Sequence, residues 1–287
     1  MRSSRSIGYL FASPWIITFL IFWLFPLCYS LYLGFTDYRL LRPTYNWVGM
    51  DNFVALFSDR AFLEALKNTF IFVLGTIPIT TVISLFLALL VDRNFPGRTL
   101  FRSGFFMPSI TSMVVIALIF TNLYSRGGYI CLLSQMVGLT PPENGFLLSH
   151  KTALLSIMAM DVWMSVGYYM LLFLAGLKSI PGELYEAADV AGAGSIRKFF
   201  HITLPLLKPV ALFVIVINTI KSFQVFIEMF VMTKGNYGTS SAVYFIYETG
   251  LNRFEFGYAS AAAYILFLII AGFSILQFGL IKQRNTW

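Results

Sequence analysis

Six long apolar stretches constrain this chain more than any other feature of its sequence. They lie near residues 9–34, 69–91, 104–124, 152–177, 209–233 and 260–281. Because a helix rises 1.5 Å per residue, about 20 apolar residues cross the ~30 Å hydrocarbon core of a bilayer. Only 11% of the 287 residues are charged, against about 25% in soluble domains. We therefore predict an all-α polytopic membrane protein with six transmembrane helices in a single domain, residues 1–287.

The first stretch follows a basic start, Arg2 and Arg5, of the kind found in secretory signal peptides. Its apolar run, 8–34, is far longer than the roughly 7–15 apolar residues of a signal peptide. We therefore expect an uncleaved spanning helix that bends near Pro14 or Pro26, where the ring removes a backbone N–H.

The distribution of basic residues predicts the orientation. With the N-terminus inside, eleven of the twenty Lys and Arg residues are cytoplasmic, eight are outside and Lys221 is intramembrane. Cytoplasmic loops carry an excess of Lys and Arg, so we expect both termini in the cytoplasm. Anionic lipid accounts for the +7 net charge, and no nucleic-acid partner is expected. The eleven are Arg2, Arg5, Arg93, Arg98, Arg102, Lys178, Arg197, Lys198, Lys208, Lys282 and Arg284.

A polar segment, 178–208, separates the fourth and fifth stretches. Pro181 suits the first position of a helix, where its missing N–H has no partner to lose. Gly192 and the small residues after it interrupt that helix, and Ser195 can cap a second one. We expect Leu204-Pro205 to end the second helix. The segment is therefore predicted to be a cytoplasmic helix–turn–helix.

This segment resembles the EAA loop of binding-protein-dependent ABC importer permeases over about twenty residues. Further similarity, to the carbohydrate-transporting branch, lies at Trp163 and Gly167, at 223–226 and at 256–259. One departure is Ala191, where the family often has an acidic residue. The matching loop residues are Glu186, Ala187, Ala188, Gly192, Ala193, Phe199, Ile202, Leu204 and Pro205.

The resemblance implies the type I ABC importer permease fold and a location in a bacterial or archaeal cytoplasmic membrane. It implies a second permease, commonly a different chain, two copies of a cytoplasmic ATPase, and an external solute-binding protein. The loop then docks on the ATPase: Glu186 meets a basic residue, Ala187 and Ala188 permit close packing, and Gly192 makes the turn. Without the family, an amphipathic helix resting on lipid is the alternative.

The sequence contains no G-x-x-x-x-G-K-[ST] phosphate loop. We therefore expect a transport subunit and not an enzyme, with ATP and Mg²⁺ bound by a partner ATPase and no cofactor in this chain. Cys28 and Cys131 have no metal-ligand spacing, so no metal site is expected.

Three ionisable residues fall within the apolar stretches: Asp161, Lys221 and Glu228. Each costs about 2.5–3.5 kcal/mol near a helix centre and so is expected to face a cavity or a partner. In a continuous fifth helix, spacings of i, i+3, i+6 and i+10 place four polar residues within an arc of about 120°. These four are Asn218, Lys221, Gln224 and Glu228.

Phe223 and Phe226 flank this polar stripe. Aromatic rings beside amides and carboxylates are typical of sugar sites, so we assign the stripe, Phe223 and Asp161 to the substrate pathway. A structural interhelical ion pair of Lys221 with Glu228 or Asp161 is the alternative. Lys221 also leaves open an anionic solute such as glycerol phosphate.

Two other classes of function remain as alternatives. A secondary transporter driven by an ion gradient would use the intramembrane charges but has no need of an ATPase-docking loop. A purely structural membrane subunit would explain the loop and not the polar stripe. The sequence does not distinguish monosaccharide, oligosaccharide and polyol as the solute.

Overall fold

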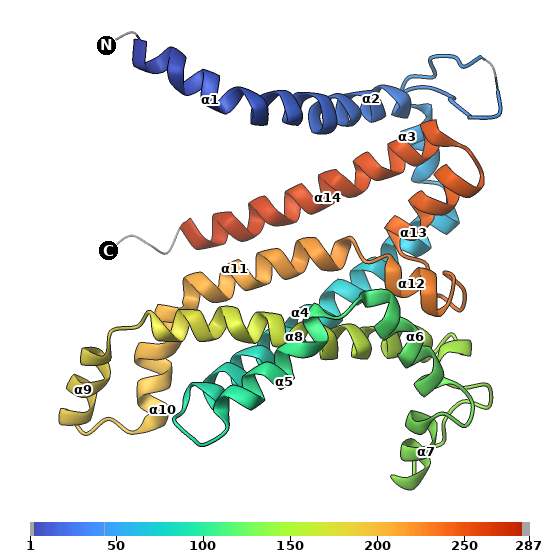
Figure 1. The fold of residues 1–287 in the computed structure, drawn as a ribbon. Helices are drawn as coiled ribbons and strands as arrows, with labels where there is room; N and C mark the ends of the chain where they lie inside the picture. Colours follow the sequence, from blue (N-terminus) through green and yellow to red (C-terminus); the bar gives the residue numbers. More distant parts are fainter. Residues whose placement is uncertain (1–2, 43, 283–287) are drawn as a thin grey trace. The chain divides into compact units, whose positions relative to one another are not determined.

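The computed structural model describes residues 3–42 and 44–282, and those residues form helices and connecting segments without a β-strand (Figure 1). By length and composition, five helices within them can cross a membrane, or six if one bent pair of helices is counted as a single span. The predicted all-α class is confirmed. Arg2 and Arg284, counted above with the cytoplasmic residues, lie outside the described residues.

The chain forms two compact units. The first comprises Met1–Leu63 and Phe245–Leu268, and the second comprises Glu64–Tyr244 and Ile269–Trp287. Two long helices, α4 (Arg60–Asp92) and α14 (Phe256–Lys282), contribute residues to both units.

In the first unit, α2 packs against the beginning of α14 through small residues. Ser30 donates a hydrogen bond to Ser260 (3.3 Å), and a Cβ on Gly34 would lie 3.4 Å from the backbone nitrogen of Ala261. A π turn, Leu20–Leu24, interrupts the first span shortly before Pro26, the second residue of α2. The further elements of this unit are α1 (Ser3–Phe19), the π turn Leu20–Leu24, α2 (Phe25–Gly34), α3 (Asp51–Leu56), the end of α13 (Ala242–Tyr247) and the π turn Glu248–Asn252.

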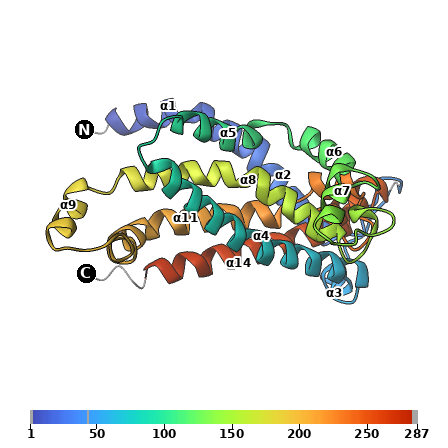
Figure 2. The same cartoon turned by 90° about the horizontal axis from the view of Figure 1, so that it is seen from below.

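In the second unit, α8 lies between α5 and α11, as both views show, and it also contacts α6 and α12 (Figures 1 and 2). Within the most apolar 18 residues of each helix, 72% of α8 is buried, whereas only 28% of α4 is buried. The central helix of this unit is therefore α8. The elements of this unit besides α4 and α14 are α5 (Arg98–Ile110), α6 (Met113–Tyr124), α7 (Tyr129–Met136), the 3₁₀ turn Phe146–Leu148, α8 (Ala153–Lys178), α9 (Gly182–Val190), α10 (Ser195–Lys198), the π turn Phe199–Thr203, α11 (Leu204–Phe223), α12 (Ile227–Met232) and the start of α13.

Small and hydroxylated residues allow the helices to approach α8 closely. The Ser84 hydroxyl on α4 donates to the Val166 carbonyl (2.9 Å), and the Ser109 hydroxyl on α5 donates to the Met164 carbonyl (2.9 Å). A Cβ on Gly167 would lie 1.9 Å from the carbonyl oxygen of Phe105. The hydrophobic effect does not drive helices together inside a membrane. Small residues at helix interfaces allow close packing, and the van der Waals contacts then stabilise the association.

Gly167→Ala is therefore expected to lower the free energy of unfolding by about 1–3 kcal/mol, the usual cost of overpacking. Gly104→Ala, on α5, is the matched control, since a Cβ there meets no atom within 4 Å. Thermal unfolding of both purified variants in detergent measures the difference. Equal midpoints for the two variants would show that α5 and α8 do not approach as described.

The third predicted span, 104–124, is not one straight helix. It consists of the end of α5 and all of α6, which meet at an angle of 96°. The bend occurs at Thr111 and Ser112, where Thr111 has an extended backbone and Ser112 precedes the first turn of α6. Both residues at the bend are hydroxylated, and Ser and Thr are less favourable in helix interiors than at helix ends.

Candidate functional site

The predicted helix–turn–helix is present as α9 and α10, beyond the ends of α8 and α11 (Figure 1). Glu186 and Ala187 are exposed on α9, and Ala188 is half-buried. Three large apolar side chains of this segment are also uncovered: Val190 is 92% exposed, Ile196 75% and Phe200 57%. Such a cluster on a polar segment is typical of a surface that binds a partner.

A glycine-terminated turn closes α9. Gly192 has φ +72°, in the left-handed region, as predicted for the turn residue. Its N–H donates to the Asp189 carbonyl (2.9 Å), and the Ala193 N–H donates to the Ala188 carbonyl (2.9 Å). These two bonds make a Schellman motif, which satisfies carbonyls left free at the end of the helix. Ala191, where the family often has an acid, is the exposed C-cap, so this departure leaves the turn intact.

The prediction that Leu204-Pro205 ends the second helix is wrong. Leu204 is the first residue of α11, which directly follows the π turn, so the chain is helical from Ser195 to Phe223. Pro205 lies in the first turn of α11. The π turn has i→i+5 hydrogen bonds, so it shifts the hydrogen-bond register just before Pro205. This shift lets the helix continue past a residue that has no N–H to donate. The second arm of the helix–turn–helix is therefore continuous with a long apolar helix.

A cleft of about 670 Å³ separates this segment from the ends of α4 and α8. Phe199, one of the predicted coupling residues, lines it together with Phe200. Asp92, the last residue of α4, and Arg93, which follows it, also line the cleft. Lys178 at the end of α8 lies 2.6 Å from Asp92. The ends of α4 and α8 are thus joined to each other beside the cleft.

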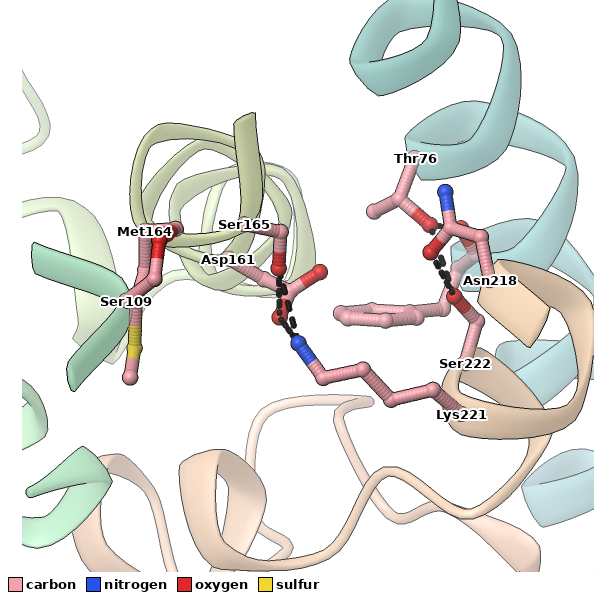
Figure 3. A network of polar contacts seen from close by, with 9 residues as sticks. Thr76, Ser109, Asp161, Met164, Ser165, Asn218, Lys221 and Ser222 are labelled. Atoms are coloured by element: carbon pink, nitrogen blue, oxygen red, sulfur yellow. Dashed lines mark hydrogen bonds and ion pairs between the residues drawn. The ribbon is translucent and has the colours of Figure 1, made fainter. Parts of the chain in front are cut away.

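Two of the intramembrane charges pair between α8 and α11 (Figure 3). Nζ of Lys221 lies 2.7 Å from the Ser165 hydroxyl and 3.4 Å from Oδ1 of Asp161. Ser165 in turn donates to Oδ1 of Asp161 (3.4 Å). The side chain of Asp161 is 5% exposed and that of Lys221 46%. A buried carboxylate is thus matched by a lysine that also reaches an open surface, which removes most of the cost of an isolated charge.

Asn218 points to another side of α11, toward α4 (Figure 3). Its Oδ1 accepts a hydrogen bond from Ser222 (3.3 Å), whose hydroxyl lies 3.5 Å from that of Thr76. Asn218 is 1% exposed, and its Nδ2 has no hydrogen-bond partner among the described residues. The structure therefore does not bring Asn218 together with Asp161 and Lys221.

The predicted stripe does not continue past Phe223, where α11 ends. Phe223 is buried against the rings of Phe70 and Phe273 and so belongs to the packing between helices. Gln224 is exposed in the break between α11 and α12. Glu228 is buried on α12, a helix that contacts α8.

A cavity of about 300 Å³ lies beside the Lys221 ion pair. Its wall includes four polar or aromatic residues that the sequence analysis missed: Ser109, Ser165, Tyr168 and Tyr169. The spacing of Ser165 four residues after Asp161 was the available signal, because residues i and i+4 share a helix face. The cavity combines rings, hydroxyls and one ammonium group.

Residues 80–284 match the family described as binding-protein-dependent transport system inner membrane component. The chain belongs to this family. The probable ABC transporter permease protein YesP of Bacillus subtilis (strain 168) is 36% identical, over 100% of this chain and 95% of the relative. The arabinooligosaccharides transport system permease protein AraP of the same organism is 32% identical, over 96% of this chain and 88% of the relative.

The fold of the permease is also that of a solved importer. The crystal structure of a bacterial ABC transporter involved in the import of the acidic polysaccharide alginate contains a chain with a TM-score of 0.86, 24% identity and full coverage of both chains. The predicted permease fold is thus confirmed. As a member of this family, the permease is a transport subunit and not an enzyme, and the ATPase is a separate chain.

Proposed function

We propose that this permease imports a carbohydrate, delivered by an external solute-binding protein, across a bacterial or archaeal cytoplasmic membrane. It acts as a single permease domain, residues 1–287, with both termini in the cytoplasm. Its partners are a second permease chain and two copies of an ATPase that binds ATP and Mg²⁺. The transport of arabinooligosaccharides named for the relative AraP supports this class of solute.

The exposed side chains of the helix–turn–helix support the proposal that this segment docks on the ATPase and couples ATP hydrolysis to transport. Three apolar side chains of this segment are exposed: Val190, Ile196 and Phe200. The carboxylate of Glu186, on the same segment, is exposed too. Exposed apolar side chains on a polar segment favour burial against a protein partner. The helix α10 continues through the π turn into α11, the helix that carries Lys221. When the ATPase displaces this segment, α11 is therefore displaced with it, because no flexible loop lies between them.

The cavity beside Lys221 supports a neutral carbohydrate over an anionic solute such as glycerol phosphate. Tyr168 and Tyr169 offer rings, and Ser109 and Ser165 offer hydroxyls. The positive charge of Lys221 is already matched by the carboxylate of Asp161, whose Oδ1 lies 3.4 Å from Nζ. The cluster therefore has no uncompensated positive charge with which to select an anion.

Reconstitution of the complete transporter in proteoliposomes tests the proposal. We expect uptake of a neutral oligosaccharide to require the binding protein and ATP on the ATPase side, and to be insensitive to uncouplers. Excess glycerol phosphate is expected not to compete. Uptake that proceeds without the ATPase and stops with an uncoupler would instead establish the ion-driven secondary transporter.

A further inference from the structure

Two side-chain contacts join the arms of the helix–turn–helix. Nζ of Lys198 on α10 lies 2.7 Å from Oδ1 of Asp189 on α9. The hydroxyl of Tyr185 on α9 lies 2.9 Å from that of Thr203 in the π turn. Neither contact involves a residue that the EAA resemblance assigns to ATPase docking.

The spacing of these residues places the two contacts one above the other between the arms, and we call each contact a rung. Tyr185 and Asp189 are four residues apart on α9, so they share one face. Lys198 and Thr203 are five apart, and the i→i+5 bonding of the π turn brings residues at that spacing toward a common side. The rungs lie in antiparallel order, with the ion pair near the Gly192 turn and the hydroxyl contact further from it.

We propose that these four residues form a two-point brace that positions α9 on the base of α11 and makes the segment move as one body. The proposal rests on the proposed function, in which the ATPase displaces α9. One contact alone leaves α9 free to rotate about it, whereas two contacts a helical turn apart fix both its distance and its rotation.

Burial supports a mechanical role for the brace. The side chain of Lys198 is only 21% exposed, although lysine on a polar segment normally extends into water. Thr203 is buried, and both residues line the cleft that faces α4 and α8. Because Tyr185 and Asp189 face the second arm, Glu186 and Val190, each one position further along α9, remain exposed for the ATPase.

The test compares variants within the complete transporter by the amount of solute imported per ATP hydrolysed. In Tyr185→Phe/Asp189→Ala both contacts are broken, because neither new side chain can donate or accept a hydrogen bond. We expect the ratio to fall by about tenfold, the factor that corresponds to losing one hydrogen bond and one exposed ion pair. Copurification with the ATPase and the basal ATPase rate are expected to stay at wild-type levels. A merely structural role would lower the amount of assembled transporter and leave the ratio unchanged.

Charge exchange supplies the rescue. Asp189→Lys/Lys198→Asp restores the ion pair in the opposite sense and is expected to recover most of the ratio, while Asp189→Lys alone is not. If the variant that breaks both contacts imports as much solute per ATP as the wild type, the brace is disproved and the proposed function is unaffected. If Glu186→Arg also has wild-type ATP-dependent uptake, the docking assignment fails and the brace fails with it.

Discussion

Replacing Glu186 with arginine is expected to lower ATP-dependent uptake by at least about 30-fold, while the protein remains inserted. The carboxylate is exposed on α9 beside the uncovered side chain of Val190. Truncating an interface hot spot costs about 2 kcal/mol or more, and 1.4 kcal/mol is roughly tenfold in affinity. The arginine would also be repelled by the basic residue of the ATPase that we propose contacts Glu186.

Glu183→Arg is the control, because Glu183 is an exposed acid on the same helix outside the matching motif. Uptake into proteoliposomes and copurification of the ATPase are measured for both variants. We expect Glu183→Arg to resemble wild type in both measurements. Equal losses from the two variants would indicate a general charge effect and would contradict docking through Glu186.

Gly192→Leu is expected to uncouple transport through the backbone alone. A side chain at this position meets no atom within 4 Å, but φ is +72°. A non-glycine residue in such a conformation costs about 1–2 kcal/mol, so the Schellman turn opens and the arms separate. Gly182→Leu is the matched control, since that site is equally open and its φ is not positive. Uptake normal for Gly182→Leu and lost for Gly192→Leu is the expected result.

The turn at Gly192 was predictable because its cause is local. A glycine flanked by alanines after a helix of small residues has few alternatives to a left-handed C-terminus. The long apolar helices were predictable for a similar reason, since length and composition alone decide whether a segment can cross a bilayer.

The end of α11 was not predictable, because neither proline nor glycine causes it. Val225 in the break is buried with Met229 and Met232, and its carbonyl accepts a hydrogen bond from the Ser241 hydroxyl (2.7 Å). A contact sixteen residues away thus replaces a helical hydrogen bond, and the spacing that aligned Gln224 and Glu228 with Lys221 no longer applies. The same holds for the Tyr185–Thr203 contact, which exists only once the turn and the π turn are formed.

Removing the ammonium group of Lys221 is expected to be the most destabilising single change in the intramembrane cluster. Lys221→Met leaves the carboxylate of Asp161 buried and unpaired, and breaking a buried pair costs about 3–5 kcal/mol. Asp161→Asn is expected to cost less, because the half-exposed ammonium of Lys221 can turn toward the open surface. Lys178→Met is the control, since that exposed ion pair is worth about 1 kcal/mol at most.

The double variant Asp161→Leu/Lys221→Met separates the two roles left open for this pair. Apolar residues of similar size in place of a buried ion pair are often neutral or stabilising, so thermal stability in detergent is expected to return to near the wild-type value. If the cavity beside Lys221 carries the solute, uptake is lost in this stable variant, because the ammonium group that lines the cavity is gone. If uptake recovers together with stability, the pair serves only to hold α8 against α11, and the solute path lies elsewhere.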